Sequence, residues 1–326
     1  MKKTVFVVGA AGSTEFDNTG RMPIGSALAV QIEALLDGEL TNRDGPISNA
    51  LMRNGGLTDV HLTAMAQIRS GIHSRDSIDQ FIDDRSDSPY IAMIAKLCIA
   101  HLILTAERST ALHVPRGQTG EGAMRSLRQT WLSQVLRRSN EPMNRQRVLD
   151  CLADVAFVTF NYDRCIEQFI LLSVAATCAL SLSEAAKIAA QVPVHHVYGS
   201  LGDIFDPAGN KVPFGSDDIW SISHGASRIR TFTEEMESTD APHFQACLRD
   251  ADNIVCLGMA YHSQNLRLLF PDGSPNGSVY GTTLGLRPRA LGELSSFFQA
   301  SAASTRWIAI KCSEFVEEIG DDIFPA

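Results

Sequence analysis

The sequence lacks the cysteine pattern of a disulfide-linked or zinc-binding protein. Its 326 residues include 7 cysteines, an odd number, and these are scattered along the chain with no CxxC pair. That spacing supports neither a disulfide framework nor a zinc ribbon. Most of the cysteines lie among apolar neighbours, which indicates small core residues.

Long apolar runs and an excess of positive charge are also missing. The most apolar stretch, residues 91–106, is interrupted by Lys96 and His101 and falls short of the ~18 apolar residues of a membrane span. The run from Val5 to Val8 is too short for a secretory signal. A net charge of −9 leaves no broad basic face for nucleic acid or an anionic membrane. We therefore expect a cytoplasmic protein with no direct nucleic-acid or membrane contact.

The sequence does contain alternating strand and helix patterns. Apolar, β-branched runs predict strands at 3–8, 156–159, 192–198, 253–257, 278–282 and 306–310. Helical patterns separate them, at 26–36, 181–190, 266–269, 291–300 and 313–319. Strands that alternate with helices predict an α/β fold, with a Rossmann-like parallel sheet covered by helices on both faces.

The strand signal nearly vanishes in the middle of the chain, where helical periodicity replaces it. We interpret this block as a large helical insertion. The expected organisation is a Rossmann-like domain formed by residues 1–40 and 151–326, with a helical subdomain at 41–150.

Ligands of open α/β sheets bind at the carboxyl ends of the strands, so the residues after each strand are the candidates for a site. The first strand is followed by GAAGS at residues 9–13. These small residues suit either close approach to a pyrophosphate or simply a tight βα turn. The dehydrogenase fingerprint GxGxxG is not matched, because Ala11 and Thr14 stand where glycine is required. This argues against hydride transfer but not against nucleotide binding.

The second strand is followed by Asn161-Tyr162-Asp163. The amide of Asn161 can orient a ribose hydroxyl or a water molecule. Asp163 can bind a ribose hydroxyl or cap the helix that begins after it. Asn161 lies before the cap position, so capping does not account for it.

Two adjacent histidines, His195 and His196, precede the next small-residue turn. Neighbours in a strand point to opposite faces, so only one of them can face a given pocket. That histidine could act as a general base or be a hydrogen-bonded structural residue.

The fourth strand end has Gly258, which permits close backbone approach, and then Ser263 or Asn265 as a helix cap.

Together these segments resemble the sirtuin (silent information regulator) superfamily, and in particular its bacterial antiphage NAD hydrolases. GAAGS is similar to the family's GAGxS turn, TFNYDRCIE at 159–167 to its TTNYDxxxE segment, HVYGSLG at 196–202 to its HGSL strand end, and LGMAYHSQNLRLL at 257–269 to its GxxxxDxNL segment. One departure is Tyr198, which stands where the family usually has its catalytic histidine. The absence of a zinc ribbon argues against histone-type deacylation.

The resemblance implies an NAD+ glycohydrolase, with NAD+ as substrate and no metal. It implies Asn161 as the amide that holds ribose or water and His196 as the base, reaching the site from one pleat before Tyr198; His195 stays open as the alternative base. The implied NAD+-binding residues are Gly9, Ala10, Ala11, Gly12, Ser13, Asp163, Tyr198, Gly199, Ser200, Gly258, Met259 and Ala260.

The same resemblance implies a homo-oligomer that acts as an antiphage effector by depleting NAD+. It also implies a separate partner, a HerA-like ATPase or alternatively a short Argonaute. A second interpretation is a catalytically weak NAD+ or ADP-ribose binding subunit that regulates or scaffolds a partner ATPase. A nucleotide-dependent nuclease ranks lowest, because no carboxylate cluster typical of a metal site is visible.

Overall fold

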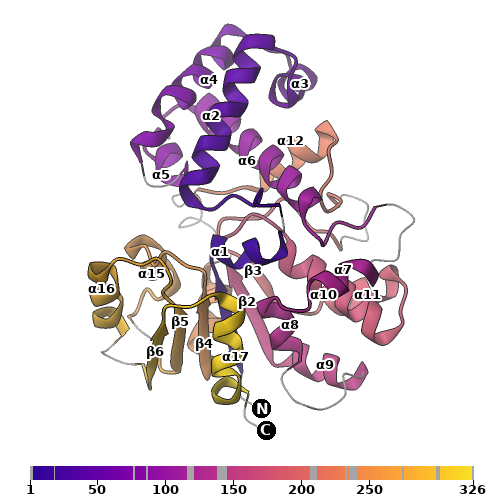
Figure 1. Cartoon of the computed structure of the whole chain (residues 1–326). Helices are drawn as coiled ribbons and strands as arrows, with labels where there is room; N and C mark the ends of the chain where they lie inside the picture. The colour runs from indigo at the N-terminus through magenta and orange to yellow at the C-terminus, as the bar shows by residue number, and fades with distance from the viewer. Residues whose placement is uncertain are drawn as a thin grey trace.

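The centre of the molecule is a six-stranded, all-parallel sheet with the strand order β3-β2-β1-β4-β5-β6 (Figure 1). The computed structural model describes residues 3–17, 19–75, 78–85, 87–115, 121–137, 145–205, 211–231, 234, 241–273, 275–298 and 302–324. The strands are β1 (Thr4–Val8), β2 (Val155–Thr159), β3 (Val194–His196), β4 (Asn253–Leu257), β5 (Ser278–Thr282) and β6 (Thr305–Ile308). The chain order reverses between β1 and β4, as in Rossmann-like folds, so the expected α/β sheet is confirmed.

Helices cover both faces of the sheet, which explains why its central strands β1, β2 and β4 are nearly continuous apolar runs. Along β1, Val5 and Val7 belong to one hydrophobic core, and Phe6 and Val8 to the other. The first core includes α14 (Ala241–Arg249), α15 (Ser263–Leu269) and α16 (Pro288–Phe298). The second includes α8 (Trp131–Leu136), α9 (Arg145–Ala153), α10 (Cys165–Cys178), α11 (Leu182–Ala189) and α17 (Cys312–Ile323). Residues 299 and 300, the end of one expected helix, lie outside the described residues.

A group of helices, here called the helical lobe, stands above the carboxyl ends of the strands (Figure 1). It comprises α2 (Gly25–Asn42), α3 (Pro46–Arg53), α4 (Asp59–Gly71), α5 (Ile78–Asp83), α6 (Pro89–Ser109) and α12 (Ile219–Arg228). The helix α6 contacts α2, α3, α4, α5 and α12, so it is the central helix of the lobe. Its length and apolar composition alone would fit a membrane span, but 56% of its most apolar window is buried inside the protein.

The division between the two parts differs in detail from the boundaries expected at residues 40 and 150. Helix α2 packs in the helical lobe, and α12 joins the lobe from far along the chain. Helices α7 (Glu121–Ser126), α8 and α9 instead pack with α10 and α17 beside the sheet. The lobe is therefore assembled from two separate segments of the chain.

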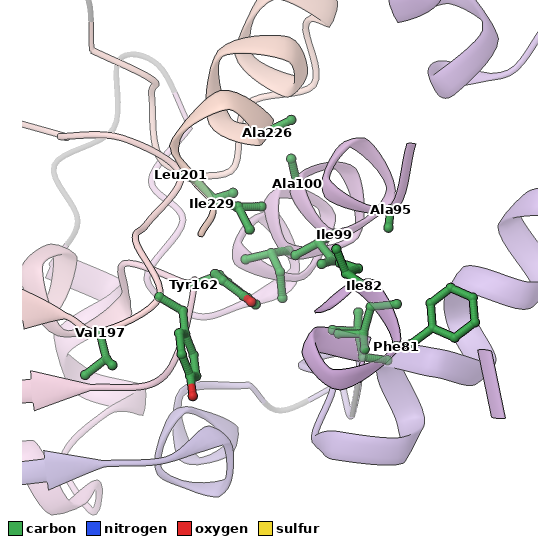
Figure 2. Close-up of a cluster of buried hydrophobic side chains, with 14 of the residues drawn as sticks. Phe81, Ile82, Ala95, Ile99, Ala100, Tyr162, Val197, Leu201, Ala226 and Ile229 are labelled. Carbon is green, nitrogen blue, oxygen red and sulfur yellow. The ribbon is translucent and has the colours of Figure 1, made fainter. Parts of the chain in front are cut away.

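An apolar cluster and a buried ion pair join the lobe to the sheet. Figure 2 shows side chains of α5, α6 and α12 meeting those after β2 and β3, among them Ile99, Tyr162 and Leu201. Beside them, Glu107 at the end of α6 receives a hydrogen bond from Arg164 Nη2 to Oε2 at 2.6 Å, and both side chains are fully buried. Arg164 immediately follows Asp163, so this pair fixes the turn after β2 to the lobe.

Candidate functional site

A cavity of about 730 Å³ lies at the carboxyl ends of the strands, beneath the helical lobe. This volume falls within the range of small-molecule and cofactor sites. The residues that line it follow β1, β2, β3, β4, β5 and β6, and the lobe adds a mainly apolar wall. The lobe side consists of Ile24, Gly25, Leu28, Ile78, Gln80 and Ile103, with Pro23 just before it.

The expected ligand residues divide into those that line this cavity and those that do not. Lining residues are Gly9, Ala10, Ala11, Asn161, Asp163, Tyr198, Gly258, Met259 and Ala260. The predicted residues outside the lining are Gly12, Ser13, His196, Gly199 and Ser200. The predicted set thus combines residues that line the cavity with residues that lie outside its lining.

The small residues of the first turn are required by backbone packing. A Cβ on Gly9 would lie 2.5 Å from the carbonyl oxygen of Gly258. The turn forms the helix α1 (Ala10–Ser13), and Ala11 N donates to Gly258 O at 3.3 Å. The amides of Gly9, Ala11 and Gly12 all donate to carbonyl oxygens of the protein, so few amides of this turn remain for a pyrophosphate.

Asn161 is held in one orientation at the floor of the cavity. Its Nδ2 donates to Gly9 O at 3.2 Å and to Ser13 Oγ at 2.8 Å. A backbone carbonyl can only accept, so these bonds fix which end of the amide is nitrogen. The carbonyl oxygen Oδ1 has no donor among the described residues, and Asn161 lines the cavity. This leaves Oδ1 as the atom that Asn161 offers to a ligand.

Asp163 has a structural role and also lines the cavity. Its Oδ1 accepts from Ser13 Oγ at 3.0 Å and from Cys165 N at 3.1 Å, at the start of α10. Burial, reinforced by the nearby charge of Glu107, raises the pKa of Asp163 above its ordinary value, although hydrogen bonds from the side chain and backbone of Cys165 and from Ser13 oppose this rise. The N-cap residue of α10 is Arg164, so Asp163 lies one position before the cap expected for it and contacts the helix through Cys165 N.

His196 does not reach the cavity, which corrects its expected role as the base. Its Nδ1 donates to Asn161 O at 2.7 Å, and its Nε2 donates to Glu167 Oε1 at 2.7 Å. Both partners are acceptors, so both ring nitrogens carry protons and no lone pair is left to take another. Burial lowers the pKa of His196, but Glu167 and the Asn161 carbonyl outweigh burial and hold it above the ordinary value. His196 therefore stabilises the loop of Asn161 through a hydrogen bond to its backbone carbonyl.

The alternative base, His195, also lies elsewhere. Its Nε2 lies 3.6 Å from the sulfur of Cys247 on α14, and His195 is absent from the cavity lining. The two histidines thus face opposite sides of β3, as the period of a strand requires.

Tyr198 occupies the cavity position expected for a histidine. Its hydroxyl donates to Asn265 Oδ1 at 2.8 Å, and its ring lies 5.7 Å from that of Phe160, next to Asn161. Gly199 then turns with a φ of 73° against the backbone of Arg228, where a side chain would collide with the Arg228 carbonyl oxygen. Gly199 and Ser200 therefore connect β3 to the lobe and do not contact the cavity.

The loop after β4 is held in a constrained conformation. Gly258 has a φ of 64°, and its amide donates to Thr282 Oγ1 at 2.9 Å. Tyr261 adopts a left-handed φ of 53°, uncommon for a residue with a side chain, and its hydroxyl donates to Thr282 O at 2.9 Å. This geometry fixes the direction in which the chain enters α15.

Sequence reasoning missed several polar residues of the cavity. Glu15 joins two helices, because its carboxylate accepts from Trp131 N and Ser313 N at 2.8 Å each. Lys311 is the one lysine or arginine among the described lining residues. His262 and Asn265 also line it, although Asn265 was expected only as a possible cap. The available signal for His262 and Asn265 was their position shortly after β4, since the carboxyl ends of all the strands meet at this edge of the sheet.

No group of three or more histidine, cysteine, aspartate or glutamate side chains within the described ranges has the arrangement of a metal site. Comparisons with protein-family models, curated proteins and solved structures give no match for this chain. The structure therefore defines the chain as a Rossmann-like α/β protein with a cavity at the carboxyl edge of its sheet.

Proposed function

We propose that this protein binds NAD+ in the cavity and hydrolyses the bond between nicotinamide and ribose, releasing nicotinamide and ADP-ribose. The observation that carries the proposal is the side-chain amide of Asn161, whose Nδ2 is held by two hydrogen bonds and which lines the cavity at the carboxyl edge of a parallel sheet. Nucleotide ligands are typical of this edge in Rossmann-like folds.

The chemistry of the bond agrees with the groups present. When nicotinamide leaves, positive charge develops on the anomeric carbon of the ribose. A preorganised dipole stabilises such charge without having to reorient, and the oxygen of Asn161 is such a dipole. The apolar wall of Leu28, Ile78 and Ile103 suits an uncharged aromatic leaving group and excludes water from it.

The biological part of the proposal follows from the family resemblance. We infer an antiphage effector that depletes NAD+, that works as a homo-oligomer, and that is activated with a HerA-like ATPase, or alternatively a short Argonaute. The large helical lobe over the cavity supports control by assembly, because a partner that moves the lobe would alter access to the cavity.

A second candidate is a regulatory or scaffold subunit that binds NAD+ or ADP-ribose with little turnover. The double hydrogen bonding of His196 favours it, because the imidazole expected as the base is not available.

The test is to incubate the full chain with NAD+ over a range of protein concentrations, alone and with the partner ATPase, and to separate the products. Equal release of nicotinamide and ADP-ribose supports hydrolysis. Calorimetric binding of NAD+ without turnover in any condition supports the second candidate. Absence of both binding and turnover contradicts both candidates.

A further inference from the structure

The cavity contains one imidazole that the family pattern does not predict. Of the histidines in the described part of the chain, only His262 lines the cavity. His195 and His196 are engaged elsewhere, as shown above. Resting on the proposed hydrolysis of NAD+, we propose that His262 is the general base that activates the attacking water.

The backbone places His262 at the mouth of the site. It directly follows the left-handed Tyr261 and is the N-cap residue of α15, yet its side chain makes no cap hydrogen bond. No hydrogen bond or ion pair to its imidazole occurs within the described ranges. A ring nitrogen of the neutral imidazole is therefore left to accept a proton.

The residue three positions later shows which end of the cavity His262 occupies. Asn265 receives the hydrogen bond from Tyr198, and the Tyr198 ring contacts Phe160 beside Asn161. Residues three apart lie on the same side of a helical turn. The first turn of α15 is thus next to Tyr198, whose ring packs near Phe160, the residue before Asn161.

Exposure distinguishes His262 from His196 in a way that matters for catalysis. The side chain of His262 is exposed, whereas that of His196 is buried in an ion pair with Glu167. A base must return its proton to solvent after each turnover, and an exposed imidazole at the edge of the cavity can do so directly. Imidazole is the side-chain group most often used as a general base near neutral pH.

The proposed step balances as follows. The bond between the pyridinium nitrogen and the anomeric carbon breaks, and its electron pair stays on nicotinamide, which leaves uncharged. The water oxygen bonds to the anomeric carbon while one water proton passes to the ring nitrogen of His262. That proton then goes to solvent, so NAD+ and water give nicotinamide, ADP-ribose and H+.

Other titratable groups near His262 either share the cavity lining or lie on the helix packed against α15. Those that share the lining are Glu15, Asp163, Tyr198, Lys311 and Cys312. Burial raises the pKa of the Cys312 thiol to about 12. The neighbouring α14, which packs on α15, carries His243, Cys247 and Arg249, none of which lines the cavity.

The experiment compares His262→Gln with His243→Gln, which changes an exposed histidine of α14 outside the cavity. The turnover number is measured from about pH 5 to 8, and NAD+ binding is measured by calorimetry. For wild type and His243→Gln we expect turnover to rise with pH. For His262→Gln we expect binding to be retained, turnover to fall about 100-fold or more, and the rise with pH to disappear. In His262→Ala, added imidazole should restore part of the turnover.

An unchanged turnover and pH profile in His262→Gln, with an active wild type, would overturn this inference and leave the proposed function standing. A second pattern would also overturn it: turnover falls in His262→Gln but still rises with pH, and imidazole does not restore activity to His262→Ala. That pattern indicates a structural role for His262. A wild type that never consumes NAD+ would overturn both proposals, so the two failures are distinguishable.

Discussion

The imidazole of His196 lies 2.7 Å from the carboxylate of Glu167, and the two side chains form a largely buried ion pair beneath the loop that carries Asn161. The backbone oxygen of Asn161 accepts a hydrogen bond from the other ring nitrogen. The charge of His196 therefore affects how firmly the loop of Asn161 is held. We expect this coupling to appear as a dependence of stability on pH.

The pKa of His196 is raised in the folded protein, so its contribution to stability is fully present below the ordinary histidine value of about 6.5. It is lost as the pH rises through the higher folded value. One proton gives a slope of at most about 1.4 kcal/mol per pH unit. Urea unfolding from about pH 6 to 9 should show this loss in wild type and a flatter profile in His196→Gln. Equal slopes would contradict the ion pair.

The buried pair of Arg164 and Glu107 should be important for stability. Arg164→Met leaves the carboxylate of Glu107 buried without its cation, and breaking such pairs costs about 3–5 kcal/mol. The matched control is Arg289→Met, which removes an exposed pair with Glu293 and should change the free energy of unfolding by less than about 1 kcal/mol. Similar effects of the two variants in urea unfolding would show that Arg164 does not join the lobe to the sheet.

The close approach of Gly9 and Gly258 predicts that neither turn tolerates a side chain. Gly9→Ala places a methyl group 2.5 Å from Gly258 O, so one of the two turns must move, and we expect lower thermal stability and weaker NAD+ binding. Gly38→Ala is the control, because its Cβ meets no atom within 4 Å and Gly38 lies inside α2. Alanine should stabilise that position by about 0.5–1 kcal/mol. A Gly9→Ala variant with unchanged melting temperature and affinity would contradict the packing described.

Asp163 should show opposite effects on stability and function. Its pKa is raised mainly by burial, so its ionised form at neutral pH is disfavoured in the folded protein. Asp163→Asn keeps an acceptor for Ser13 and Cys165 but removes the buried charge, so the melting temperature at pH 7 should rise or stay the same. NAD+ turnover should fall, because Asp163 lines the cavity where we propose that the ribose binds. The gain in stability should shrink as the pH falls toward the ordinary aspartate value, and a gain that grows there would contradict this reasoning.

The sheet could be predicted from the sequence because its central strands β1, β2 and β4 are apolar runs, and helical patterns separate the successive strands. The expected strand at 253–257 matches β4, and that at 278–282 matches β5. The composition of the lobe was predictable as helical, but its inclusion of α12 was not, since α12 is separated by over a hundred residues from α6, the helix it packs on. Local patterns contain no signal for such a contact.

For the site, the sequence directed attention to the carboxyl edge of the sheet, where the cavity lies, and Asn161 lines that cavity. The sequence could not show that Glu167, in the helix after Asn161, would accept a hydrogen bond from the imidazole of His196. Nor could it show that a left-handed Tyr261 would bring His262 to the cavity. Both depend on side-chain partners and backbone angles that residue types alone do not determine.

The central claim is that Asn161 acts on NAD+, and Asn161→Ala tests it most directly. Nicotinamide release is measured for wild type, for Asn161→Ala and for Asn49→Ala, a control on α3 outside the cavity lining. Thermal melting confirms that each variant folds. For Asn161→Ala the account predicts turnover at least about 100-fold lower, the size of loss seen when a group that stabilises transition-state charge is removed. For Asn49→Ala it predicts unchanged turnover. A folded Asn161→Ala protein that releases nicotinamide at the wild-type rate would contradict the account.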